Sequence, residues 1–174
     1  MPRLLQGECS YQTERLTVLG YDGYMNKSEL PGHVLNIMTP GVTQALPAAW
    51  QNINTASEAD NWLKRVNDEC SFLLVQLKDT QEIIGFVFLY EPPITLLPID
   101  VRIGYLLNEQ YWGAGIASEL IKGFLTWCNT HGSIRSITGG VELDNIGSIK
   151  VLEKNGFVQE ESNEEGTVFY VYNF

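Results

Sequence analysis

A glycine-containing turn between two regular segments is the part of this sequence best suited to bind a charged ligand. Gly113-Ala114-Gly115 follows a strand-like segment and opens the clearest amphipathic helix of the chain. Glycines let backbone N–H groups approach an anion, and the unpaired donors and positive dipole end of a helix favour its charge. The pattern predicts a phosphate-binding site, although a plain glycine turn before a helix is the structural alternative.

Two better-known nucleotide-binding patterns do not fit this turn. A P-loop needs GxxxxGK[ST], but no lysine follows the turn before Lys122. A dinucleotide fingerprint would use Gly113, Gly115 and then Ser118, with an acidic residue about twenty positions later, where residues 133–138 offer none. A phosphate bound at this turn would therefore belong to another class of ligand, and the plain glycine turn remains the structural alternative.

The segments that would position this turn alternate between strands and helices within one domain spanning residues 1–174. Alternating or apolar strand patterns occupy residues 13–19, 71–77, 82–90, 99–107, 133–142, a short stretch around Val158, and 167–174. Helical spacing occupies a segment capped by Thr55 or Ser57 that ends near Asn67, residues 116–128, and residues 145–154. This order predicts an α+β fold.

Composition excludes several classes of protein. The 174 residues carry a formal net charge of −10, which would repel a nucleic-acid backbone and is compatible with cationic substrates or with solubility alone. Apolar stretches such as residues 83–90 are too short to cross a membrane, so we expect a cytoplasmic protein. Three scattered cysteines without ligand spacing predict neither disulfides nor a metal site.

Three ordered motifs of this sequence resemble those of the GNAT superfamily of N-acetyltransferases. Gln110, Gly113 and Gly115 match its [QR]-x-x-G-x-[GA] signature, residues 102–107 (RIGYLL) are similar to its IGY-containing strand, and residues 145–157 are similar to its N-xx-S-xxx-LEKxGF segment. The opening TERL at residues 13–16 looks like the RimJ/RimL-like branch of ribosomal-protein acetyltransferases. The resemblance covers residues 13–174 and is weak between Gly20 and Trp50.

The resemblance implies a mixed, mostly antiparallel twisted sheet of six or seven strands flanked by helices, with acetyl-CoA entering a V-shaped gap between central strands. It also implies that the backbone around Tyr105, Leu106 and Leu107 pairs with the pantetheine arm. Asn145 would contact that arm or help to place the thioester, and it could also cap the following helix. The segment assigned to the pyrophosphate comprises Gln110, Gly113, Ala114, Gly115, Ile116, Ala117 and Ser118.

The reaction implied by the resemblance requires a base and an acid. A neutral amine attacks the thioester carbonyl, and coenzyme A leaves as a thiolate that needs a proton. The family's usual tyrosine is replaced here by Leu152. The RimJ/RimL-like branch is similar to this chain in having a serine at the position of Ser148, so the resemblance implies that Ser148 is the proton donor. Arg102 stands where the family often has a glutamate and cannot be a base. Asp100 is therefore our candidate base, with Glu91 as the alternative, although both could be solvated surface charges.

The acceptor is the least determined part of the prediction. Deprotonating a lysine amine at pH 7 costs about 4.6 kcal/mol and an α-amino group about 1.4 kcal/mol, so a protein N-terminus needs less help from a base. We therefore expect direct acetyl transfer to an N-terminal α-amino group, by a metal-free monomer or homodimer. The alternatives are a small cationic amine, such as a polyamine or aminoglycoside, and a non-catalytic acetyl-CoA-binding module.

Overall fold

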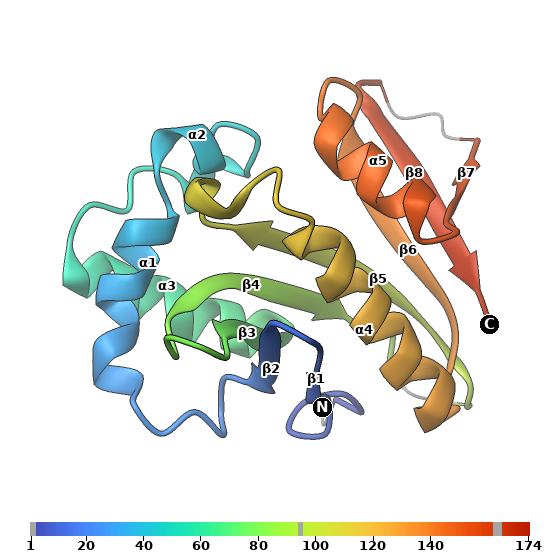
Figure 1. Cartoon of the computed structure of the whole chain (residues 1–174), viewed down its shortest axis with the longest axis horizontal. Coiled ribbons are helices and arrows are strands. Elements are labelled where there is room, and N and C mark those ends of the chain that lie inside the picture. Colours follow the sequence, from blue (N-terminus) through green and yellow to red (C-terminus); the bar gives the residue numbers. More distant parts are fainter. Residues whose placement is uncertain (1–2, 94–95, 162–164) are drawn as a thin grey trace.

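The computed structural model describes residues 3–93, 96–161 and 165–174 and contains one eight-stranded sheet with helices on both faces (Figure 1). The strands are β1 (Tyr11–Gln12), β2 (Leu16–Gly20), β3 (Ser71–Leu77), β4 (Ile83–Tyr90), β5 (Ile99–Leu107), β6 (Ile134–Glu142), β7 (Val158–Glu160) and β8 (Thr167–Asn173). The α-helices are α1 (Leu30–Ile37), α2 (Pro40–Thr43), α3 (Ala56–Glu69), α4 (Ile116–His131) and α5 (Ile146–Lys154). Short 3₁₀ turns are η1 (Lys27–Glu29), η2 (Ala48–Trp50) and η3 (Glu109–Tyr111).

The sheet has the strand order β1-β2-β3-β4-β5-β6-β8-β7, and only the β5–β6 pair is parallel among the described strands. The α+β class and the mostly antiparallel mixed sheet are therefore confirmed. The described residues form eight strands where six or seven were expected. The strand β1 was not predicted, because its two residues are too few to show an alternating pattern. A contact with α4 holds β1 in place, because the Tyr11 hydroxyl donates to the Leu120 carbonyl at 2.7 Å.

Two apolar cores cover the two faces of the sheet. On one face, α4 and α5 pack over buried residues such as Ile121, Phe124 and Leu152. On the other face, α1 and α3 bury an aromatic group in which Trp62 meets Phe86 with ring centroids 5.4 Å apart. A ligand that reaches the sheet from one face is thus separated from the other face by the strands themselves.

The strands separate at one place, between β5 and β6. Their parallel pairing runs from Ile99, opposite Ile134, to Ile103, opposite Gly139, while β5 continues to Leu107 and β6 to Glu142. The final residues of β5 remain paired with β4 on the other side, where Gly85 faces Leu107. Figure 1 shows β6 diverging from β5 toward α5. This separation opens the middle of the sheet.

Local capping signals fix the ends of the helices. Thr55 accepts a hydrogen bond from the Glu58 amide in a reciprocal capping box at the start of α3. Gly115 and Gly132, with φ of 78° and 76°, bound α4 in the left-handed conformation that glycine adopts without strain. At α5, the Asn145 side chain accepts from the Ser148 amide at 3.2 Å. The three predicted helices are therefore present where their caps place them.

Candidate active site

A cavity of about 450 Å³ opens at the place where β5 and β6 separate. It lies between the end of β5, the first turn of α4 and one side of α5, with two residues from the α2 region at its edge. The lining residues are Val42, Leu46, Tyr105, Leu106, Leu107, Tyr111, Trp112, Gly113, Gly115, Ile116, Ala117, Ser118, Gly147, Ser148, Lys150, Val151 and Lys154. This cavity has the size of a site for a small-molecule ligand.

The glycine turn forms the anion-binding end of this cavity. Gly113 has φ of 74°, and a Cβ added there would meet nothing within 4 Å, so the backbone borders open space. The turn leads into α4, a helix of sixteen residues whose first amides are free of intrahelical partners. The arrangement can bind a phosphate group through backbone donors and the positive end of the helix dipole.

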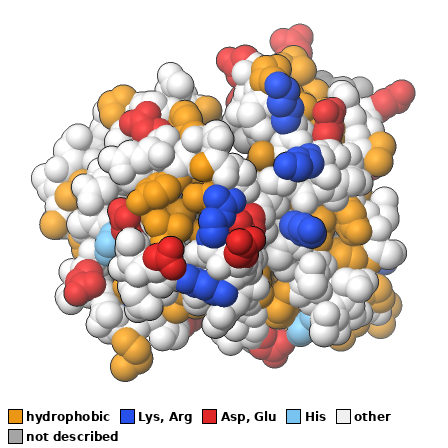
Figure 2. All heavy atoms as spheres, viewed as in Figure 1, with side chains coloured by type: hydrophobic (Ala, Val, Ile, Leu, Met, Phe, Trp, Pro, Cys, Tyr) orange, Lys and Arg blue, Asp and Glu red, His pale blue; other side chains and the backbone are white. Residues whose placement is uncertain are grey.

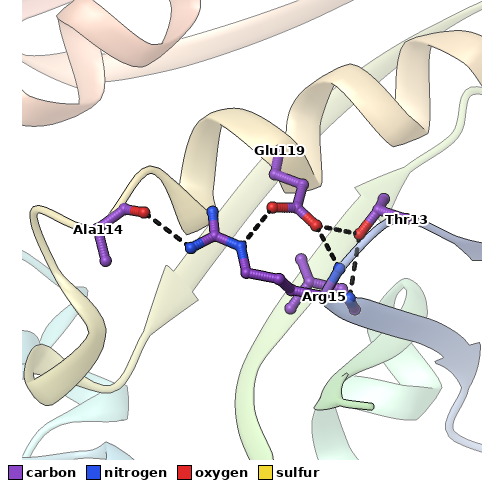
Figure 3. A network of polar contacts seen from close by, with 5 residues as sticks. Thr13, Arg15, Ala114 and Glu119 are labelled. Atoms are coloured by element: carbon purple, nitrogen blue, oxygen red, sulfur yellow. Dashed lines mark hydrogen bonds and ion pairs between the residues drawn. The ribbon is translucent and has the colours of Figure 1, made fainter. Parts of the chain in front are cut away.

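The Arg15 side chain links this turn to the first turn of α4 (Figure 3). Its Nη1 donates to the Ala114 carbonyl at 2.9 Å, and its Nε donates to Glu119 Oε2 at 2.7 Å. Glu119 also accepts from the Thr13 hydroxyl at 2.6 Å and from the Arg15 amide. Burial raises the pKa of Glu119, but these hydrogen bonds lower it more, and its net pKa lies below the ordinary value. The network connects the segment between β1 and β2 with the turn that precedes α4 and with the first turn of α4.

We expect Arg15→Ala to weaken acetyl-CoA binding by about tenfold, because a charge-assisted contact that fixes the turn is lost at a partly exposed site. Arg15→Lys should recover only part of the loss, since lysine lacks the planar fork that reaches both partners. Calorimetric titration measures the dissociation constant. The matched control is Arg65→Ala, which removes an arginine of α3 that donates to the Ala49 carbonyl in η2. At saturating acetyl-CoA the kcat should be unchanged. A fall in kcat with unaltered affinity would contradict this positioning role.

Two lysines face the glycine turn from α5. Lys150 and Lys154 lie one helical turn apart, and both line the large cavity. Figure 2 shows Lys and Arg side chains gathered over α4 and α5 on this face, although the whole chain has a net charge of −10. The cavity therefore combines backbone donors and two cationic side chains, which suits a ligand with several phosphate groups.

A second cavity of about 180 Å³ continues through the opening between β5 and β6. Its walls include Ile103 and Leu152 from the core under α4 and α5, but also Trp50 and Phe88 from the aromatic core on the opposite face. The complete lining is Leu46, Trp50, Phe88, Tyr90, Ile103, Gly104, Tyr105, Gly139, Gly140, Val141, Ser148 and Leu152. Two molecules could thus approach one point from opposite sides of the sheet.

The two cavities share Leu46, Tyr105 and Ser148. Of these residues, Tyr105 and Ser148 carry hydroxyl groups, one from β5 and one from the first turn of α5. The Tyr105 hydroxyl oxygen is buried and has no hydrogen-bond partner among the described residues. Burial raises the pKa of Tyr105, and the nearby Ser148 side chain opposes the rise only in part. The shared point therefore offers protonated hydroxyl donors at neutral pH.

Nine of the thirteen predicted site residues line a cavity. They are Tyr105, Leu106, Leu107, Gly113, Gly115, Ile116, Ala117, Ser118 and Ser148. Gln110, Ala114 and Asn145 lie outside both linings: the Gln110 amide donates to Asn108 Oδ1, the Ala114 carbonyl accepts from Arg15, and the Asn145 side chain caps α5. The capping role considered for Asn145 is present.

The structure does not bring the two candidate bases to either cavity. The Asp100 carboxylate accepts from both Arg135 and the Ser136 hydroxyl, and its pKa is lowered chiefly by the hydrogen bond from Arg135. Glu91 accepts from the Leu5 amide at 2.7 Å and from the Ser71 hydroxyl at 3.1 Å, so it fastens the N-terminal segment to the sheet. Each carboxylate makes a structural contact, and neither is placed to act as a base at the cavities.

Several residues that line the cavities or support the glycine turn were missed by the sequence argument. The Tyr105 side chain was overlooked because only its backbone was considered, and Arg15 because its partners Ala114 and Glu119 lie about a hundred positions away. The pairing of Lys150 with Lys154 at helical spacing was the one available signal for the cationic wall. Among the three cysteines, Cys128 is buried, and burial raises its pKa to about 12, which disfavours a nucleophilic thiolate.

In the described part of the chain, no helix combines the length and apolar character needed to cross a membrane. Within the same residues, no group of three or more His, Cys, Asp and Glu side chains is arranged to hold a metal ion.

Comparisons with known proteins identify the family. The model of the acetyltransferase (GNAT) domain matches residues 27–158, which is most of the chain, so the protein belongs to the GNAT acetyltransferase family. It is 26% identical over 131 residues to the uncharacterized N-acetyltransferase p20 of Bacillus licheniformis, covering 68% of this chain and 71% of that protein. It is 31% identical over 96 residues to YjdG of Bacillus subtilis, another uncharacterized N-acetyltransferase, covering 55% of each chain.

The fold is shared with solved structures of lower sequence identity. The structure of RimL, a ribosomal L7/L12 α-N-protein acetyltransferase in complex with coenzyme A, superimposes with a TM-score of 0.74 at 20% identity. The match covers 95% of this chain and 98% of that one. The similarity confirms the GNAT fold expected from the sequence motifs.

Proposed function

We propose that this protein transfers an acetyl group directly from acetyl-CoA to a primary amine, and that its acceptor is the N-terminal α-amino group of a peptide or protein. The observation that carries the proposal is the meeting of two cavities at Tyr105 and Ser148. One cavity has phosphate-binding features and the other has apolar walls. A two-substrate transfer without an acyl-enzyme needs such a meeting point.

The residues of the large cavity fit coenzyme A. The Gly113–Ser118 amides and the side chains of Lys150 and Lys154 would hold its phosphates, and the end of β5, which is unpaired on the β6 side, would border its arm. The bound molecule supplies an acetyl thioester as the group to be transferred. Ser148 lies in the first turn of α5 and lines both cavities. From there its hydroxyl would donate a proton to the departing thiolate.

The lack of an available carboxylate favours an α-amino acceptor. No Asp or Glu belongs to the lining of either cavity in the described residues. An α-amino group at pH 7 loses its proton at a cost of about 1.4 kcal/mol, whereas a lysine amine costs about 4.6 kcal/mol. A site without a strong base can use the first amine more readily. RimL, whose fold this chain shares, is an α-N-protein acetyltransferase.

A pair of peptides tests the proposal. Both peptides carry one lysine, one with a free N-terminus and one with a blocked N-terminus, and each is incubated with enzyme and acetyl-CoA before mass spectrometry. We expect acetylation of the free-N-terminus peptide only, on its α-amino group. Equal modification of lysine in both peptides would overturn the α-amino acceptor. If no peptide or small amine is acetylated although acetyl-CoA binds, a binding module without catalysis is favoured.

A further inference from the structure

The smaller cavity is lined mainly by apolar and aromatic residues. Four aromatic residues contribute to it, and Trp50 and Phe88 stand with ring centroids 4.8 Å apart. The lining residues that carry a polar side-chain group are Trp50, Tyr90, Tyr105 and Ser148. Among the described residues, no charged side chain lines it.

We propose that this cavity selects an amine attached to one uncharged apolar or aromatic group, and that it rejects polycations. The inference rests on the proposed transfer to an amine and names the chemistry of the acceptor. In a peptide the selected group would be an apolar first side chain such as that of phenylalanine or leucine. In a small molecule it would be an arylalkylamine.

The size of the cavity supports one compact group. Its volume is about 180 Å³, and an apolar protein cavity of about 150 Å³ is sufficient to bind benzene. Three glycines, Gly104, Gly139 and Gly140, contribute walls without side chains. Added Cβ atoms would lie 3.6 Å from Phe88 at Gly104 and 3.3 Å from Leu152 at Gly139, and both neighbours line the cavity. The free space is therefore maintained where side chains would narrow it.

The charge distribution argues against a polyamine. A second ammonium group brought into this cavity would lose water without gaining a carboxylate partner, which is costly. The nearby cation Arg102 lies over the Phe169 ring at 5.7 Å, and Asp100 is paired with Arg135. Arg102 adds a positive charge near the cavity, and the Asp100 carboxylate is already paired, so no free carboxylate is available to a second ammonium group.

The same apolar walls help the reaction itself. Burial in a medium of low polarity disfavours the charged form of an amine and lowers its pKa. A single amine that enters the cavity is thereby shifted toward the neutral, nucleophilic form. This effect partly replaces the base that neither Asp100 nor Glu91 is placed to provide.

The first experiment measures kcat/KM for peptides that differ only in their first residue, Phe, Leu, Ala, Asp or Lys, beside 2-phenylethylamine and spermidine. We expect kcat/KM for the Phe and Leu peptides to be about tenfold or more above that of the Ala peptide. It should be about a hundredfold above that of the Asp and Lys peptides. Acetylation of phenylethylamine but of no peptide would support the apolar pocket and overturn the peptide acceptor. N-terminal acetylation independent of the first residue would overturn the inference and leave the proposed function intact. Preference for spermidine would overturn both.

The second experiment narrows the cavity. Gly104 lacks a positive φ, and its added Cβ would make only ordinary contact with Phe88, so Gly104→Ala should fold. We expect the Phe-to-Ala ratio of kcat/KM to fall at least fivefold, with unchanged acetyl-CoA affinity because Gly104 lines only the smaller cavity. Gly20→Ala, on β2 with open space around the added atom, is the control. An unaltered ratio in the folded Gly104→Ala enzyme would contradict the assignment of this cavity to the acceptor.

Discussion

Replacing Gly113 by aspartate should weaken acetyl-CoA binding by at least a hundredfold, whereas replacing it by asparagine should weaken binding by less than tenfold. The two side chains have nearly the same shape, and both tolerate a positive φ better than most residues. Gly113 has φ of 74° and open space where a side chain would project, so neither variant should disturb the packing. The difference between them isolates one negative charge.

The size of the expected effect follows from electrostatics. Two unit charges 4 Å apart repel by about 4 kcal/mol at the effective dielectric constant typical of a protein surface. Screening by salt and the freedom of the aspartate side chain reduce this value, which leaves an effect on the order of a hundredfold. The repulsion requires that a phosphate occupies the turn, which is the feature under test.

Calorimetric titration with acetyl-CoA gives the dissociation constants, and thermal unfolding without ligand checks that both variants are folded. Measurement at low and high salt adds a second readout, because only the aspartate variant should regain affinity as salt screens its charge. Equal loss of affinity in the two variants would show that backbone strain, not a bound phosphate, explains the effect. Unchanged affinity in both would remove the phosphates from this turn.

The parts of the fold that were predicted correctly are those fixed by nearby residues. Thr55 with Glu58, the glycines around α4, and Asn145 before α5 act within a few positions of the helix ends that they determine. Period-two alternation similarly identified β2 and β5, and runs of strand-forming residues identified β3 and β4. Residues 102–107 were assigned to a cofactor-binding strand by resemblance, and the structure places Tyr105, Leu106 and Leu107 beside the large cavity.

The predictions that depend on distant pairing are less complete. Asp100 has the residue type and strand face of a candidate base, but parallel pairing sets it opposite Ser136 and beside Arg135. The sequence of β5 contains no sign of that neighbour. The opening between β5 and β6 likewise depends on where the two strands stop pairing. The exposure of Tyr105 to both cavities depends on the same point.

Removing the two hydroxyls at the shared point should slow acetyl transfer far more than it weakens binding. We expect Ser148→Ala to lower kcat by about a hundredfold and Tyr105→Phe by about tenfold to a hundredfold, the range of a lost proton donor or relay. The dissociation constant of acetyl-CoA should change by less than threefold, since both substitutions keep the cavity walls. The double variant should lose less than the product of the single losses if the hydroxyls act together.

The pH dependence separates proton donation from packing. Burial raises the pKa of Tyr105, so its phenol remains protonated through neutral pH and well into the alkaline range. The rise of kcat/KM with pH should therefore reflect deprotonation of the acceptor amine, and it should be the same in the wild type and in Tyr105→Phe. In the wild type kcat/KM should not decline below about pH 10. Tyr111→Phe, which removes a cavity hydroxyl bonded to Glu82, is the matched control and should retain kcat. A loss in Tyr111→Phe as large as in Tyr105→Phe, or kcat unaffected by both Ser148→Ala and Tyr105→Phe, would contradict a proton path at the junction of the cavities.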